Sequence, residues 1–148
     1  MPFAQLADVR LHYRIDGADD APPLLLANSL GTTADMWEPQ IPALAGRLRV
    51  IRHDTRGHGL SQVTPGPYSI EQLGRDALGL LDHLRIERAH FCGLSMGGMV
   101  GMFSASMRPS ASIASSSRTP RQRSARRRHG TRASKPYAKA AWRRLRRR

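Results

Sequence analysis

Residues 89–102, AHFCGLSMGGMVGM, decide how this chain folds. The apolar residues 89–92 predict a short buried strand, and the small residues 97–102 favour the start of a helix. A G-x-S-x-G motif occupies residues 93–97, at the strand-to-helix turn that its mechanism requires. Such a turn strains the backbone of the serine and points its hydroxyl away from the sheet. The stretch therefore predicts a strand, a sharp turn and a helix, with Ser95 at the turn.

Ser95 is the candidate nucleophile of this turn. Gly93 and Gly97 are expected on either side of it because a Cβ at either position would keep the neighbouring elements apart. The alternative is that Ser95 is a serine that caps the helix and has no part in chemistry. The strand before it and the helix after it favour the nucleophile.

A nucleophilic serine also needs donors for the negative oxygen that its attack creates. The backbone N–H of Met96 would stand at a helix N-terminus, where partial positive charge favours such an oxyanion. We expect the second donor from the loop at residues 28–31, and we assign it to the N–H of Leu30. A plain turn in that loop is the alternative.

The residues before the motif predict a sheet with helices packed on it. Residues 9–15 alternate apolar and polar side chains, which is typical of a half-buried strand, whereas residues 24–27 form an apolar run suited to a strand covered on both faces. Ser69 and Gln72 form a capping box, and apolar residues at helical spacing follow as far as Leu84. A shorter helix is expected over residues 36–44 and a strand over residues 48–52. This order predicts an α/β fold with a doubly wound, mostly parallel sheet.

The charge of the chain divides it into two parts. The 148 residues carry 24 Lys and Arg against 11 Asp and Glu, a net charge of +13. All the acids lie in residues 1–103, whereas residues 104–148 hold 15 of the basic residues and no acid. We therefore expect a folded domain over residues 1–103 and a disordered basic tail over residues 104–148, which has too little apolar content to form a core.

Cysteine content and hydropathy bear on the cellular compartment in which we expect the protein. One cysteine, Cys92, excludes a disulfide and a cysteine-ligated metal site within one chain. Neither a signal peptide nor an apolar run of membrane-spanning length is present, and we expect a cytoplasmic protein.

Four runs carry a more specific resemblance: NSLGTTADMW, DTRGHGLS, GPYSIEQLGRDALGLLDHL and HFCGLSMGGMVGM. Together they make residues 1–102 resemble the N-terminal half of an α/β-hydrolase, and closely resemble the 3-oxoadipate enol-lactonases. Cofactor-free haloperoxidase-like esterases are near neighbours. The resemblance implies a serine hydrolase without a cofactor that opens an enol-lactone ring in bacterial aromatic catabolism, with a small lactone or ester as its substrate.

The same resemblance implies a Ser-His-Asp triad whose acid and histidine both follow the serine. Neither is present, because no Asp or Glu follows Ser95, and the one later histidine, His129, lies in the basic run RRRHGTR. The upstream histidines and Asp54 are interpreted as structural, with Asp54 bracing its loop through backbone N–H groups. The chain is therefore expected to lack activity as it stands.

Two interpretations of residues 104–148 remain open. In one, the chain is a nucleic-acid-binding or scaffolding protein with a non-catalytic hydrolase half. Its basic tail then binds the phosphates of nucleic acid without sequence specificity. In the other, the tail is read out of frame. With one permitted codon chosen for each of residues 103–123, a reading that starts at the third base of the Phe103 codon gives LGVHAPERIDRIVVANTAAK. That reading has a helix end, a proline and an apolar strand, which favours a frameshift.

We predict that the gene carries a single-base insertion or deletion close to the codons for Met102 and Phe103. Resequencing of genomic DNA across these codons, with raw reads inspected, is the measurement. The expected result is a shifted frame that stays open beyond LGVHAPER. Stop codons soon after this point in the shifted frame would contradict the frameshift.

Overall fold

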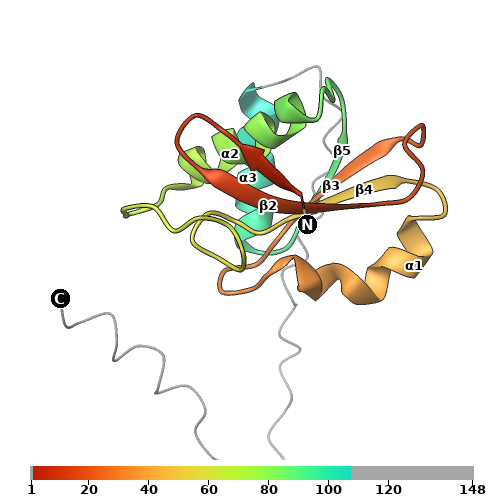
Figure 1. Ribbon diagram of the computed structural model, residues 1–148, viewed down its shortest axis with the longest axis horizontal. Coiled ribbons are helices and arrows are strands. Elements are labelled where there is room, and N and C mark those ends of the chain that lie inside the picture. Colours follow the sequence, from red (N-terminus) through yellow and green to blue (C-terminus); the bar gives the residue numbers. More distant parts are fainter. Residues whose placement is uncertain (1, 108–148) are drawn as a thin grey trace, which may run out of the picture.

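The computed structural model describes residues 2–107 of the chain. A single five-stranded sheet has the order β1-β2-β4-β3-β5 (Figure 1). Its strands are β1 (Phe3–Gln5), β2 (Arg10–Asp16), β3 (Pro23–Ala27), β4 (Arg49–His53) and β5 (His90–Gly93). The helices are the 3-10 helix η1 (Ala34–Gln40), α1 (Ile41–Leu44), α2 (Ile70–His83) and α3 (Met96–Met107).

The sheet is antiparallel at its first edge and parallel at its other. β1, β2 and β4 pair antiparallel in that order, whereas β3 pairs parallel with both β4 and β5. Strands that run parallel need a helix between them, and α2 supplies the connection between β4 and β5. The predicted α/β fold with a mostly parallel sheet is confirmed for this part of the chain.

Helices cover both faces of the sheet (Figure 1). On one face, α2 and α3 bury the larger core, in which Leu25 and Ile51 of the sheet meet Leu80 and Val100 of the helices. On the other face, η1 and α1 cover Leu24, Leu26 and Val50. Both faces of β3 are therefore buried, as its unbroken apolar run predicts.

The helix expected over residues 36–44 differs from the structure. Residues 34–40 form the 3-10 helix η1, and the α-helix α1 covers Ile41–Leu44. Pro39 lies inside η1, where its ring prevents the hydrogen bond that an α-helix would need from its backbone nitrogen. Thr33 caps η1 by accepting the Asp35 N–H.

The last helix runs beyond the expected end of the domain. α3 continues to Met107, four residues past the expected boundary at residue 103, and Ser104 is buried against α2. The remainder of the expected basic tail, residues 108–148, lies outside the described residues.

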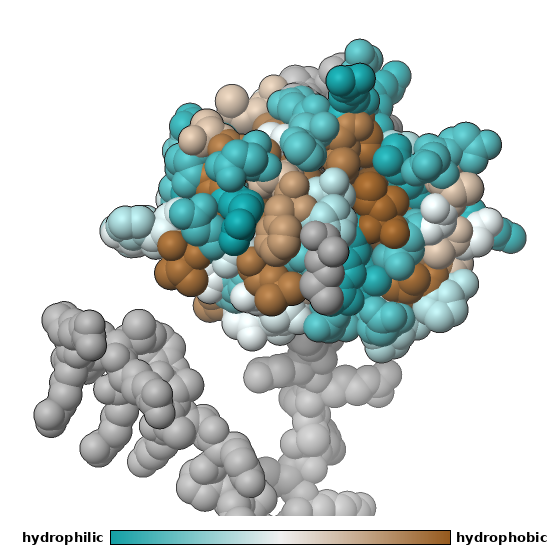
Figure 2. Space-filling view, in the orientation of Figure 1, coloured by the Kyte–Doolittle hydropathy of each residue, from teal (hydrophilic) through white to brown (hydrophobic). Residues whose placement is uncertain are grey.

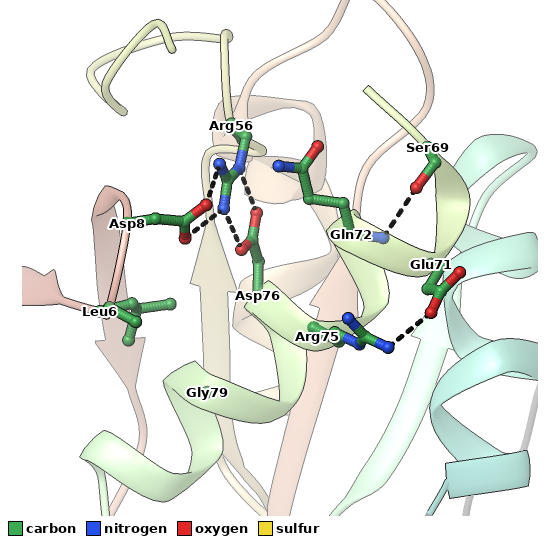
Figure 3. Close-up of a pocket in the computed structure, with 10 residues that line it drawn as sticks. Leu6, Asp8, Arg56, Ser69, Glu71, Gln72, Arg75, Asp76 and Gly79 are labelled. Atoms are coloured by element: carbon green, nitrogen blue, oxygen red, sulfur yellow. Dashed lines mark hydrogen bonds and ion pairs between the residues drawn. The ribbon is translucent and has the colours of Figure 1, made fainter. Parts of the chain in front are cut away.

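A buried arginine joins three segments on the α2 side of the sheet (Figure 3). The guanidinium of Arg56, 2% exposed, donates to the carboxylate of Asp76 on α2 and to that of Asp8 in the β1–β2 turn. The hydrogen bonds that Arg56 donates to Asp76 and Asp8 hold its pKa above the ordinary value. A cavity of about 540 Å³ lies beside these residues, lined also by Arg75 and Glu71, which pair with each other. The charged side chains named here are all paired. Through its two carboxylate partners, Arg56 ties the β4–α2 loop to α2 and to the β1–β2 turn.

Candidate active site

Ser95 stands at a strained turn between β5 and α3. β5 ends at Gly93 and α3 begins at Met96, and Ser95 has a φ of 54°. This left-handed conformation is uncommon for a residue with a side chain and persists where the surrounding structure enforces it. The side chain is exposed, and its hydroxyl makes no hydrogen bond with any residue from 2 to 107. The hydroxyl is thus free to meet a ligand.

Two glycines allow the turn to be this tight. A Cβ on Gly97 would clash with the carbonyl oxygen of Ala27 at the end of β3, and a Cβ on Gly93 would clash with the backbone of Gly97. Both contacts are with backbone atoms, which cannot rotate aside as a flexible side chain would. The first turn of α3 therefore packs directly on the ends of β3 and β5.

The sheet register places the starts of the two segments that carry the expected oxyanion donors at one edge of the sheet. Ala27 of β3 lies opposite Gly93 of β5, so the loops that follow these parallel strands leave from the same edge. The N–H of Leu94 donates to the Ala27 carbonyl at 3.1 Å. The loop with Leu30 thus begins beside the turn that carries Ser95. Met96, as the first residue of α3, has an N–H that cannot be satisfied within the helix.

Asn28 anchors the start of the Leu30 loop. Its side chain is buried, donates to the His53 carbonyl at 2.8 Å and accepts from Trp37 Nε1 at 2.9 Å. The first contact joins the loop to the end of β4, and the second joins it to η1. The loop is consequently tied to the neighbouring strand and to the helix that follows it.

His58 holds the other end of the same loop. The N–H of Gly31 donates to His58 Nε2 at 3.1 Å, and His58 Nδ1 lies 3.1 Å from the carbonyl oxygen of Arg56. Because Nε2 accepts a hydrogen bond, Nδ1 carries the proton and donates to that carbonyl. Gly31 has a φ of 77°, which suits glycine. His58 therefore supports the loop that carries Leu30, in agreement with its interpretation as a structural histidine.

Asp54 braces its loop through backbone N–H groups, as its sequence context predicts. Its carboxylate accepts hydrogen bonds from the N–H of Ala34 at 2.8 Å, the N–H of Leu60 at 3.0 Å and His12 Nδ1 at 2.9 Å. Burial of Asp54 would raise its pKa, but the hydrogen bonds from Leu60, Ala34 and His12 outweigh burial and hold the pKa below its ordinary value. The ionised carboxylate joins the start of η1 to the β4–α2 loop.

The sequence gives no signal for the His12–Asp54 pair, which resembles part of a catalytic triad. His12 lies on β2, and β4 and β3 stand between β2 and β5. At a strand spacing of about 4.8 Å this places His12 about 14 Å from the strand that precedes Ser95. His12 is fully buried and packs on Phe3. The pair is thus a structural one and cannot serve as the base for Ser95.

Other features of the described residues bear on cofactors and membranes. Within residues 2–107, no group of three or more His, Cys, Asp or Glu side chains is placed to hold a metal ion. In the same part of the chain, none of the helices has the length and apolar character that a bilayer span requires. His129 lies outside the described residues.

An exposed serine on a strained strand-to-helix turn, at the carboxyl edge of a mostly parallel sheet, is typical of α/β hydrolases. The sequence matches the family model of the alpha/beta hydrolase fold over residues 22–127. This match covers more than half of the chain, and the chain belongs to the α/β-hydrolase family.

Enol-lactonases are among its similar relatives. The chain is 51% identical over 96 residues to 3-oxoadipate enol-lactonase 2 of Acinetobacter baylyi, a match that covers 65% of this chain and 36% of the relative. The solved enol-lactonase of Burkholderia xenovorans superposes with a TM-score of 0.71 at 54% identity, covering 73% of this chain and 42% of that one. A putative carbamate hydrolase, RutD of Azorhizobium caulinodans, is 43% identical over 102 residues, 69% of this chain and 38% of the relative. The chain thus spans well under half the length of these relatives.

The bracing role of Asp54 predicts a pH-dependent loss of stability. In Asp54→Asn an amide replaces one acceptor oxygen, so at least one buried donor loses its partner, at a cost of about 1–3 kcal/mol in unfolding free energy at pH 7. Because the folded-state pKa is lowered, the stabilisation by the carboxylate is complete above the unfolded value of about 3.9 and is lost as the pH falls through the folded-state pKa. Urea unfolding followed by circular dichroism between pH 7 and pH 2 measures the difference between parent and variant.

Asp19→Asn serves as the control, because the side chain of Asp19 is 92% exposed. The control should stay within about 0.5 kcal/mol of the parent at every pH. A difference between parent and Asp54→Asn that stays constant down to pH 2 would show that the carboxylate has no such role.

Proposed function

We propose that this chain is the N-terminal part of an enol-lactone hydrolase of the 3-oxoadipate enol-lactonase type, with Ser95 as its nucleophile. The observation that carries the proposal is the left-handed Ser95 at the β5–α3 turn, exposed and held by backbone contacts of Gly93 and Gly97. Identities of 51% and 54% to two enol-lactonases support the substrate class. The substrate is then a small lactone or ester, and no cofactor takes part.

The proposed reaction is acyl transfer to Ser95 followed by hydrolysis. The Ser95 hydroxyl oxygen attacks the lactone carbonyl carbon and gives up its proton to a base. The N–H groups of Met96 and Leu30 stabilise the negative oxygen that forms. The ring C–O bond then breaks, the ring oxygen takes the proton back from the base and leaves as the enol, and the acyl group stays on Ser95. Water releases the acid and restores the serine.

The described residues supply the nucleophile side of this reaction without its base. No His or carboxylate among residues 2–107 is hydrogen-bonded to the Ser95 hydroxyl, and no acid follows Ser95 in the sequence. Without a base the hydroxyl remains protonated at neutral pH, and its attack on a carbonyl is slow. We therefore propose that the 148-residue chain is inactive or nearly so.

We further propose that the reading frame is lost at Phe103. If one base is added to the Phe103 codon, position 103 still encodes a residue and position 104 becomes Leu. The sequence then continues as GVHAPER. Position 104 is buried between α3 and α2, where an apolar side chain is favoured. In the chain as it stands, Ser104 satisfies its hydroxyl there by donating to the Val100 carbonyl at 2.9 Å. The burial of this position supports the shifted reading.

A gene with the frame restored should produce an active lactonase. We expect saturable opening of 3-oxoadipate enol-lactone, a loss of at least about 10³-fold in kcat for Ser95→Ala, and no turnover above buffer by the 148-residue chain. The measurement is the decrease of enol-lactone absorbance at matched protein concentrations.

Ser69→Ala is the matched serine control. Ser69 caps α2 through the Gln72 N–H, so this substitution costs about 1 kcal/mol of stability but leaves kcat unchanged at 25 °C. Ser95-dependent turnover by the 148-residue chain would show that the base is not missing. A frame-restored protein that hydrolyses a carbamate but not the lactone would assign the site to the chemistry named for the RutD relatives instead.

A further inference from the structure

The backbone N–H groups on either side of Leu30 both have an acceptor. The N–H of Ser29 donates to the sulfur of Met36 at 3.5 Å. The N–H of Gly31 donates to His58 Nε2 at 3.1 Å. The N–H of Leu30 itself makes no hydrogen bond with any residue from 2 to 107. The loop thus has one free N–H group between two that are held.

The direction of this free N–H is set by the carbonyl of Ser29, because both groups belong to one peptide group. The bond between Ser29 and Leu30 is trans, so its C=O and N–H point in opposite directions. The Ser29 carbonyl accepts the hydroxyl of Thr32 at 2.8 Å and the N–H of Thr32 at 3.3 Å. These two hydrogen bonds turn the carbonyl toward Thr32. The N–H of Leu30 therefore points away from Thr32.

Hydrogen bonds, rather than apolar packing, hold the loop at this point. Figure 2 shows exposed apolar residues among polar ones on the face that it presents, so an exposed leucine is ordinary on this protein. The side chain of Leu30 is 70% exposed and buries little apolar area within residues 2–107. The orientation of its peptide group consequently depends on the donors and acceptors that neighbouring residues supply.

Met36 supports the Thr32 hydroxyl from the first turn of η1. Its sulfur lies 3.0 Å from the hydroxyl oxygen of Thr32 and also accepts the Ser29 N–H. A thioether sulfur is a weak acceptor, and the hydroxyl has one proton, so the carbonyl oxygen at 2.8 Å is the stronger of its two acceptors. η1 is itself anchored, because the N–H of Ala34 donates to Asp54 at 2.8 Å. The Thr32 side chain is thus held between the loop and a fixed helix.

We propose that Thr32 is a positioning residue for the oxyanion site, which holds the Ser29 carbonyl and thereby orients the N–H of Leu30 as a free donor. This inference rests on the proposed function, in which that N–H stabilises the negative oxygen. A donor whose direction is already fixed needs no reorganisation when the charge forms. Without the hydroxyl, only the longer hydrogen bond from the Thr32 N–H holds the carbonyl, and the peptide group can rotate.

Two substitutions at this position separate the hydroxyl from the shape of the side chain. Thr32→Val keeps the branched shape and removes the hydroxyl, whereas Thr32→Ser keeps the hydroxyl. In the frame-restored protein we expect kcat for 3-oxoadipate enol-lactone to fall about tenfold in Thr32→Val, with KM within about twofold of the parent. Thr32→Ser should keep kcat within about twofold of the parent. The expected loss is smaller than the 10²–10³-fold that follows removal of an oxyanion donor, because the Leu30 N–H remains present.

Amide hydrogen exchange, followed by NMR on the 148-residue chain, gives a readout that needs no turnover. In the parent, the amide of Leu30 should be the least protected of residues 29–32. In Thr32→Val the protection of the amide at position 32 should fall about tenfold, because the Ser29 carbonyl that it donates to is no longer held. Thr32→Ser should keep the parent's protection. Circular dichroism of both variants should match the parent, so that the changes report the loop rather than unfolding.

The two measurements distinguish failure of this inference from failure of the proposed function. A protected Leu30 amide in the parent, or unchanged protection at position 32 in Thr32→Val, would overturn the inference. So would an active frame-restored protein in which Thr32→Val keeps the kcat of the parent, or in which Thr32→Ser loses as much as Thr32→Val. The expected exchange pattern together with an inactive frame-restored protein would uphold the role of Thr32 in orienting the peptide group and reject the proposed function.

Discussion

The backbone contact between α3 and the end of β3 is the constraint on which the site depends. At Gly97 the helix backbone comes so close to the Ala27 carbonyl that no other side chain fits. This approach forces the chain between β5 and α3 into a sharp turn, and Ser95 takes up the left-handed conformation as a result. The same contact sets the Ser95 turn beside the loop that leaves β3. The packing of α3 on β3 thus maintains the backbone strain at Ser95, and it leaves the Ser95 hydroxyl exposed.

Hydrogen bonds hold the loops on one side of the Ser95 turn, whereas no strand among the described residues pairs with the other side of β5. Asn28, His58 and Asp54 hold the loops beside β3 and β4 through hydrogen bonds, of which those of Asn28 and Asp54 are buried. On the far side of β5, residues 2–107 provide no strand, and no acid follows Ser95 in the sequence to activate it. Under the proposed function, the oxyanion donors expected from Met96 and Leu30 and the base belong to two different parts of one reaction. An oxyanion site without a base retains little of the rate enhancement of a triad.

Local sequence patterns predicted the elements around Ser95 because those elements depend on local chemistry. The capping box at Ser69 and the apolar run of β3 appear in the structure where the sequence places them. One short helix was expected over residues 36–44, where the structure has η1 followed by α1, because apolar spacing does not show where a proline changes the type of helix. The pairing of His12 with Asp54 joins residues 42 positions apart, and only the register of β2 against β4 brings them together. Contacts of this kind depend on tertiary packing and leave no local pattern.

The central claim is that Ser95 is a nucleophile that lacks only its activating partners. An alkyl phosphonate ester reacts covalently with an activated serine hydroxyl, and mass spectrometry of peptides locates the adduct. The account predicts rapid labelling of Ser95 in the frame-restored protein, no labelling of its Ser95→Ala variant, and labelling of the 148-residue chain no faster than that of an ordinary exposed serine. Rapid labelling of Ser95 in the 148-residue chain, or labelling of the frame-restored protein at another serine, would contradict it.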